Sequence, residues 1–123
     1  MTSHPLPHCQ LLESRGIDDC LEAVSSGEET EVFLAVSRDF YDVENYDLSA
    51  DVYPEYKAFF EAKVREISQA LAGEAKVIDW ESNRFPEWAV GEWIAIWEDA
   101  GVHLRLHHED REVPILVALG RNE

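Results

Sequence analysis

Residues 54–72 have the sequence PEYKAFFEAKVREISQALA, the strongest periodic pattern in this chain of 123 residues. Their apolar side chains recur three or four residues apart, at Tyr56, Phe59, Phe60, Val64, Ile67 and Leu71. This spacing places them on one stripe of an α-helix. Pro54 suits a first helical turn, Asp51 can cap the helix, and Gly73 suits a left-handed stop. The sequence therefore predicts an amphipathic helix over 54–72 that buries this stripe.

Upstream of this helix the signals are local and short. Residues 1–16 contain two prolines and no apolar periodicity, so we expect an irregular N-terminal arm. A short helix is expected over 18–25, because Asp18 or Asp19 can cap it and apolar residues form a small face on it.

Residues 27–41 fit two structures. Ser26 and Glu29 have the spacing of a capping box, which favours a helix over 27–41. The five apolar residues from Val32 to Val36 also fit a buried strand, and periodicity alone does not exclude it. We favour the helix and keep the strand as the alternative.

Downstream of Gly73 the pattern changes from helical to alternating. Strands are expected near residues 76–80, 92–98, 102–108 and 112–119. Helices followed by strands are typical of an α+β domain. We therefore expect a single α+β domain over 17–123, with its helices on one face of a C-terminal antiparallel sheet of about four strands.

The register of the first hairpin decides which side chains share a face. A two-residue turn at Ala100-Gly101 puts Trp97 on the face of Val102, Leu104 and Leu106. A three-residue loop shifts the parity and places Trp93 and Trp97 over His103, Arg105 and His107 instead. The first arrangement buries the tryptophans in the core, whereas the second creates a binding surface.

The second hairpin is expected to turn at Glu109-Asp110, which pairs Leu106 with Val113. Pro114 cannot donate a hydrogen bond to a neighbouring strand. The last strand is therefore expected at a sheet edge, or with Pro114 at a position that makes no such bond.

Composition excludes several classes of protein. The longest apolar runs have five residues, far fewer than the 18 or so that a membrane-spanning helix needs. The N-terminus has no basic and apolar segments of a secretory signal, so we expect a cytoplasmic protein with free thiols at Cys9 and Cys20. The formal net charge is −16, from 26 acidic and 10 basic residues. Such an excess disfavours binding to nucleic acid or anionic lipid.

The acidic residues are concentrated in one segment. Residues 18–55 contain twelve acids and one base, a net charge of −11, whereas residues 56–123 carry only −5. The leading hypothesis is a small binding protein, such as an immunity or antitoxin-type inhibitor, that captures a basic protein. The expected partner-binding residues in this segment are acids and tyrosines: Asp39, Tyr41, Asp42, Glu44, Tyr46, Asp47 and Asp51.

Two further hypotheses belong to other classes. A small-ligand-binding domain or enzyme could use a pocket lined by aromatic and basic residues, namely Trp88, Trp93, His103, Arg105 and His107. Alternatively, a homodimer could pair through an apolar face formed by Pro114, Leu116 and Ala118.

Metal and catalytic motifs are weak. Residues 42–47 resemble the start of a calcium loop, but they lack its turn glycine. His103 and His107 on a strand are about 13 Å apart, too far to share one ion. No phosphate-binding loop or nucleophile elbow is present. We therefore expect no metal or cofactor, assign no catalytic residue, and favour a binding protein over an enzyme.

Overall fold

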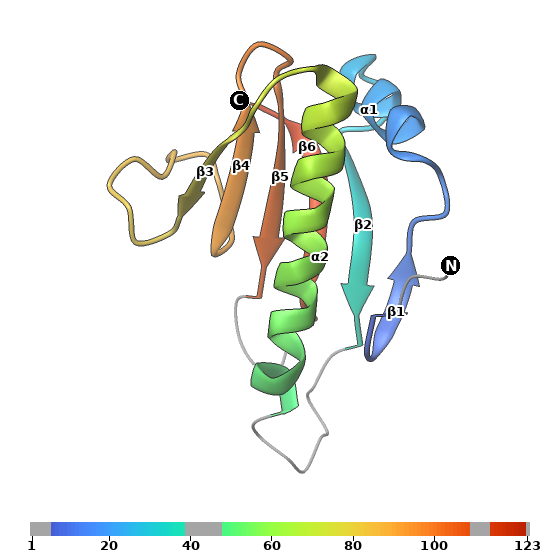
Figure 1. Ribbon diagram of the computed structural model, residues 1–123, viewed down its shortest axis with the longest axis vertical. Helices are drawn as coiled ribbons and strands as arrows, with labels where there is room; N and C mark the ends of the chain where they lie inside the picture. Colours follow the sequence, from blue (N-terminus) through green and yellow to red (C-terminus); the bar gives the residue numbers. More distant parts are fainter. Residues whose placement is uncertain (1–5, 39–47, 109–113, 123) are drawn as a thin grey trace.

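The structure is a computed structural model that describes residues 6–38, 48–108 and 114–122. Its elements in chain order are β1 (Cys9–Leu12), α1 (Ile17–Ser25), β2 (Glu31–Ser37), α2 (Leu48–Leu71), β3 (Lys76–Asp79), β4 (Trp93–Trp97), β5 (Val102–His107) and β6 (Leu116–Arg121). The strands form one antiparallel sheet, and α2 lies along one of its faces (Figure 1). The α+β prediction is confirmed.

The sheet has six strands in the order β1-β2-β6-β5-β4-β3. The four predicted C-terminal strands follow one another as neighbours, each antiparallel to the next. Two further strands from the N-terminal half extend the sheet beside β6, so the expected number of about four strands is too low. Helix α2 carries the chain from β2 to β3 at the opposite edge (Figure 1).

The predicted helix over 27–41 is wrong, and its alternative, a buried strand, is correct. Strand β2 pairs with β1 on one side and with β6 on the other. Hydrogen bonds to β1 and β6 satisfy the backbone polar groups along both edges of β2. A short isolated helix would not bury the apolar side chains of this segment. The Ser26 hydroxyl accepts a hydrogen bond from the Glu28 amide and forms a turn instead of capping a helix.

The predicted irregular arm over 1–16 contains strand β1. Arg38 N–H donates to the carbonyl of His8 at 2.7 Å, and Glu13 N–H donates to that of Leu34 at 2.9 Å. The Tyr56 hydroxyl donates to the carbonyl of Pro7 at 2.9 Å, which ties the arm to α2. Partners on β2 and α2 therefore order a segment whose own sequence has no periodic pattern.

Helix α1 confirms the prediction for 18–25, although its N-cap is Gly16, not Asp18 or Asp19. The buried face of α1 packs beside α2 in the same core, against β2 and β6. This core includes Cys20, Leu21 and Val24 from α1. Both helices therefore contribute to one apolar cluster with the sheet.

Helix α2 confirms the predicted apolar stripe but begins earlier than expected. Tyr56, Phe60 and Ile67 are at most 1% exposed. The helix starts at Leu48, so Pro54 lies inside it instead of in its first turn. Asp51 accordingly belongs to the first turn of α2, where its charge favours the helix dipole, instead of capping the helix from outside.

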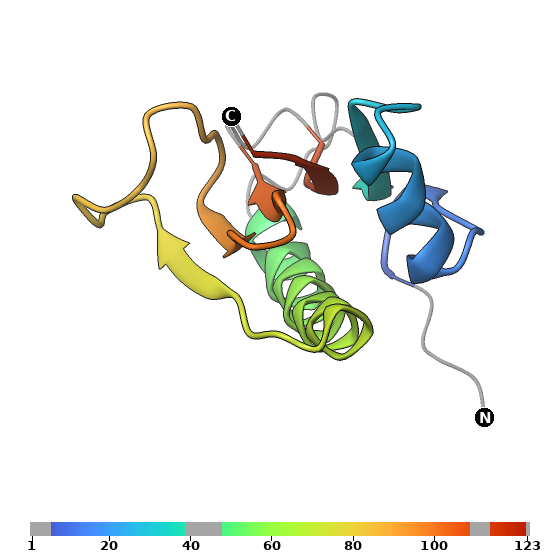
Figure 2. The same ribbon diagram turned by 90° about the horizontal axis from the view of Figure 1, so that it is seen from above.

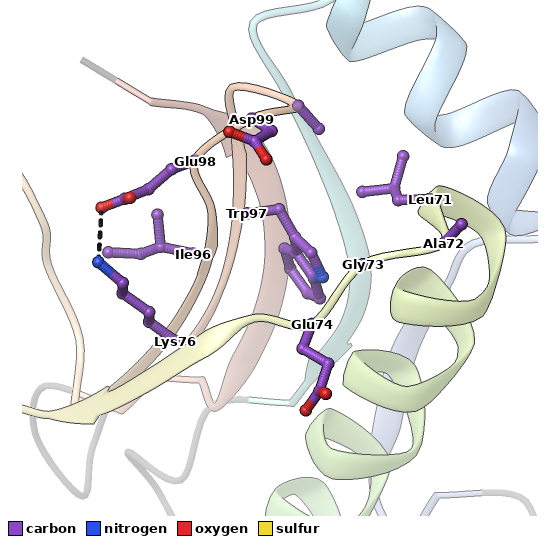
Figure 3. A pocket seen from close by; sticks show the side chains of 10 residues that line it. Leu71, Ala72, Gly73, Glu74, Lys76, Ile96, Trp97, Glu98 and Asp99 are labelled. Carbon is purple, nitrogen blue, oxygen red and sulfur yellow. Dashed lines mark hydrogen bonds and ion pairs between the residues drawn. The ribbon is translucent and has the colours of Figure 1, made fainter.

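The C-terminal end of α2 has a left-handed residue at Ala72, where φ is +53°. Gly73 N–H donates to the carbonyl of Ser68 at 3.0 Å, and Ala72 N–H donates to that of Gln69 at 3.3 Å. These two bonds form a Schellman motif. The predicted left-handed stop at Gly73 is therefore displaced by one residue. Figure 3 shows the chain leaving the helix through these residues beside Trp97.

We predict that Ala72→Gly stabilises the protein by about 0.5–1 kcal/mol, because glycine adopts positive φ without the steric cost paid by alanine. Urea unfolding measures the change. Gly73→Ala is the matched control: a Cβ there meets no heavy atom nearer than 3.9 Å, so we expect no gain of this kind. A destabilising Ala72→Gly would contradict the assigned helix end.

The β4–β5 pairing settles which face the tryptophans occupy. Trp97 pairs with Val102 and Trp93 with Leu106, so both tryptophans share the face that packs against α2. Trp97 Nε1 donates to Ser68 Oγ at 3.2 Å. The parity predicted from a two-residue turn is correct, although four residues, 98–101, connect the two strands. The arrangement that placed Trp93 and Trp97 over His103, Arg105 and His107 is wrong.

Strand β6 pairs with β5 in a different register from the one predicted. Leu106 pairs with Val117 instead of Val113, because β6 begins only at Leu116. Pro114 precedes the strand, which allows β6 to occupy an interior position between β2 and β5. The expected turn at Glu109-Asp110 lies outside the described residues.

Among the described residues, no helix combines the length and the apolar character needed to cross a membrane.

Candidate functional site on the outer face of the sheet

The sheet face opposite α2 is here called the outer face, and the connection between β3 and β4 lies on this side of the sheet (Figure 2). This connection is pinned at its end. Trp80 N–H donates to the carbonyl of Glu92, and Glu92 N–H donates to that of Leu106, both at 2.9 Å. Glu92 Oε1 accepts the backbone N–H of His108 at 2.6 Å. These bonds fix the connection against β5.

Gly91 allows this close approach. Its φ is +110°, and a Cβ built there would lie 2.7 Å from the carbonyl oxygen of Leu106. Any larger residue would push the connection away from the strand. Gly91 therefore helps to hold the preceding segment, including Trp88, over the outer face.

Beneath this connection lies a buried polar row. His103 and Arg105 on β5 are each only 8% exposed. They alternate with the core residues of β5, so they point away from α2. The Trp88 ring centroid lies 4.9 Å from that of His103. His103 Nδ1 also lies 3.2 Å from Asn122 Oδ1.

Arg105 is paired with an acid two strands away. Its Nη2 and Nε lie 2.8 and 3.2 Å from Glu31 Oε2, and its Nη1 lies 3.0 Å from His107 Nδ1. Strands two apart are about 10 Å from each other, and β6 runs between them. Ala118 and Gly120, the β6 residues opposite Arg105 and Glu31, are small enough to let the pair form across the strand.

A cavity of about 270 Å³ opens beside this ion pair. Its lining residues are Thr30, Glu31, Trp88, Val90, His103, Arg105, Gly120 and Arg121. Three of the five predicted pocket residues, Trp88, His103 and Arg105, therefore meet at one cavity.

The other two predicted pocket residues do not line it. His107 contacts Arg105 but lies beyond the cavity. Trp93 is on the opposite face, where the Lys57 ammonium sits 4.1 Å from its ring centroid. Glu31, the partner of Arg105, is not among the predicted pocket residues. The helix predicted over 27–41 does not place Glu31 on this face, whereas the alternation of a strand does.

The predicted partner-binding residues are almost all beyond the described ranges. Asp39, Tyr41, Asp42, Glu44, Tyr46 and Asp47 lie outside them. Asp51 is described and is exposed in the first turn of α2.

Other acids of the same segment form an exposed surface on and beside α1. This surface, the α1 acidic surface, consists of the exposed residues Asp18, Asp19, Glu22 and Glu28. Arg15 is the one Lys or Arg residue between residues 6 and 37. Its guanidinium lies 3.0 Å from Glu13 and 2.6 Å from Glu29. The hydrogen bonds from Arg15 lower the pKa of Glu13 to about 2. This base is therefore already neutralised by two other acids.

The predicted dimer face is smaller than expected. Ala118 is fully buried, and only Leu116 and Pro114 retain partial exposure. Self-association through these residues stays a prediction, and the exposed apolar surface available for it is limited to Pro114 and Leu116.

A second cavity, of about 230 Å³, lies between the end of α2 and the β4–β5 turn (Figure 3). Lys76 and Glu98 form an ion pair at 3.2 Å on its rim. None of the predicted site residues contributes to it.

Within the described ranges, no group of three or more His, Cys, Asp or Glu residues is arranged to hold a metal ion. Comparison with protein-family models, with curated proteins and with solved structures finds no match to this chain.

We predict that Glu31→Gln destabilises the protein by about 1–3 kcal/mol, because it leaves the buried Arg105 guanidinium without a counter-charge. Urea unfolding measures the loss. Glu28→Gln, an exposed acid nearby, is the control and should change stability by less than about 0.5 kcal/mol. Equal effects of the two substitutions would show that the Glu31–Arg105 pair does not hold the strands together.

Proposed function

We propose that the protein captures a basic protein through the acidic surface of its N-terminal half. One observation carries the proposal: four acids of the α1 acidic surface are exposed, while Arg15, the one Lys or Arg residue between residues 6 and 37, is held by Glu13 and Glu29. These acids therefore face solvent, although Asp18 and Asp19 also lie in the first turn of α1, where their charge favours the helix dipole.

Electrostatic attraction gives such a surface a kinetic advantage. Complementary charge raises association rates by about 10–10³-fold, and the effect weakens as salt screens it. Concentrated like charge also costs folding stability through self-repulsion. An inhibitor of the immunity or antitoxin type would benefit from faster association even at some cost in folding stability, because it must bind its target before the target acts.

The charge distribution supports a directed surface over a generally acidic protein. Residues 18–55 hold −11 of the net charge of −16. Asp51, near the other end of this segment, is exposed as well. A basic partner would therefore be attracted to the N-terminal half in preference to the sheet.

The test is affinity capture from the native host's lysate at low salt, followed by stepwise salt elution. The variant carries Asp19→Asn, Glu22→Gln and Glu28→Gln. The matched control carries three neutralised acids outside the segment, Glu74→Gln, Glu81→Gln and Glu87→Gln, all exposed in the wild type. Both have the same net charge, so they differ only in where charge was removed.

We expect a basic protein to be retained by the wild type and by the control. The α1 variant should release it at lower salt, because counter-charges are missing at the contact. Circular dichroism confirms that α1 still forms. Equal elution of the partner from both variants would contradict the proposal, since net charge alone would then explain retention.

A second candidate function is supported by the convergence of Trp88, His103 and Arg105 at the outer-face cavity. A cavity with an aromatic wall and a few fixed polar groups is typical of small-molecule sites. Arg121 and Arg105 there outnumber the one acid, Glu31. Small planar carboxylates are the ligand class that this lining favours.

Benzoate titration, followed through tryptophan indole resonances in NMR spectra, tests this candidate. Binding in the cavity should shift the Trp88 signal and leave Trp80, which is 61% exposed on the β3 edge, unchanged. Trp88→Ala should abolish saturable binding. Shifts of equal size at both tryptophans would indicate non-specific contact and remove the cavity from consideration.

A further inference from the structure

A third cavity, of about 300 Å³, lies between α1, α2 and the first two strands. Most of its walls are apolar: Leu6, Leu12, Ile17, Leu34, Phe59 and Ala62. Leu34 is 3% exposed and belongs to the core, so the cavity is an opening into that core. Leu12 is 55% exposed, so the apolar wall that it forms is open to solvent.

The polar residues of this cavity are held in ion pairs. Glu13 and Arg15 are paired with each other, and Arg15 also binds Glu29. Lys63 pairs with Glu66 at 2.9 Å. Together these five side chains carry a net charge of −1. Ile17 lines the cavity, and the acids of α1 begin at the next residue, Asp18. An apolar hollow therefore adjoins the α1 acidic surface.

We propose that this cavity receives a bulky apolar side chain of the basic partner, flanked in the partner's sequence by Lys or Arg residues. The inference rests on the proposed function and adds a location and a partner chemistry to it. Protein interfaces commonly combine an apolar anchor in a pocket with a charged rim. Here the cavity would supply the pocket, and the α1 acidic surface would supply the rim.

The size and the charge of the site favour this occupant. The volume accommodates about ten water-sized groups at roughly 30 Å³ each, enough for a phenylalanine or a larger side chain. A second copy of this chain would bring another −16 and be repelled. Anionic lipid is disfavoured for the same reason. A cationic segment that contains an apolar residue can place that residue in the cavity and its basic side chains against the α1 acidic surface.

The walls are preformed, which lowers the cost of binding. Arg15 makes hydrogen bonds to Glu13 at 3.0 Å and to Glu29 at 2.6 Å, bridging the segment after β1 to the turn after α1. Phe59 and Ile17 pack against the core cluster. Little side-chain freedom is therefore lost when the cavity is filled.

The experiment uses two synthetic peptides with blocked ends, Lys-Arg-Phe-Arg-Lys and the same peptide with alanine in place of phenylalanine. Binding to the full chain is measured at low salt by NMR titration. Ala62→Trp fills the cavity from α2, and Ala58→Trp, at an exposed position on the same helix that does not line it, is the control. Leu12→Ser is a second variant of the cavity wall.

We expect the phenylalanine peptide to bind at least about fivefold more tightly than the alanine peptide. Ala62→Trp and Leu12→Ser should remove this difference, and Ala58→Trp should keep it. The difference should also persist at higher salt, because it arises from apolar contact. In contrast, neutralising the α1 acids should weaken both peptides in a salt-dependent manner.

The outcomes separate the two proposals. Equal binding of both peptides, still weakened by loss of the α1 acids, would overturn the anchor and leave charge-directed capture standing. A phenylalanine preference that survives Ala62→Trp and Leu12→Ser would also overturn it. Concentration-dependent dimers that dissociate on Ala62→Trp would identify a second copy as the occupant and refute the proposed partner. If salt does not elute the partner captured from the lysate, this result would instead count against the proposed function.

Discussion

The pairing of β2 with β6 is the constraint on which the rest of the structure depends. It joins the N-terminal half to a C-terminal sheet that is otherwise built from neighbouring strands. Through it, β1 gains a partner, and α1 and α2 gain a shared surface to cover. It also places Glu31 opposite Gly120, from which the Glu31 carboxylate reaches Arg105 across the small residues of β6. Both candidate surfaces therefore follow from one register between segments about 80 residues apart.

Local patterns were sufficient for the elements that depend on local contacts. The stripe from Tyr56 to Leu71 predicted α2, and alternation predicted β3, β4 and β5, because these signals arise within single elements. Strand β2 was missed for a physical reason. Its five apolar residues have no period, and a nearby capping-box spacing favoured a helix, while the deciding hydrogen bonds come from β6 and β1. The same reason explains β1, which is ordered by β2 and by the Tyr56 hydroxyl.

The candidate site shows the same division between local and long-range information. The outer-face row of β5 could be predicted from alternation, and Arg105 and His103 do lie together. Trp93 could not be placed, because its face depends on a register that two turn lengths fit equally well. Trp88 reaches this face through a connection held by Gly91, and no periodic pattern describes that connection. Glu31 could be placed only once β2 was known to be a strand.

The ion pairs explain why the acidic excess is available to a partner. Arg15, Lys57, Lys63, Lys76 and Arg105 are each paired with an acid of the same chain. Arg15 is already held by Glu13 and Glu29, so it is not available to the exposed acids of α1. Positive charge from salt ions or from a basic partner would offset the charge of this surface. A partner that also fills the neighbouring apolar cavity would gain an interaction that salt ions cannot replace, which is the physical distinction between screening and recognition.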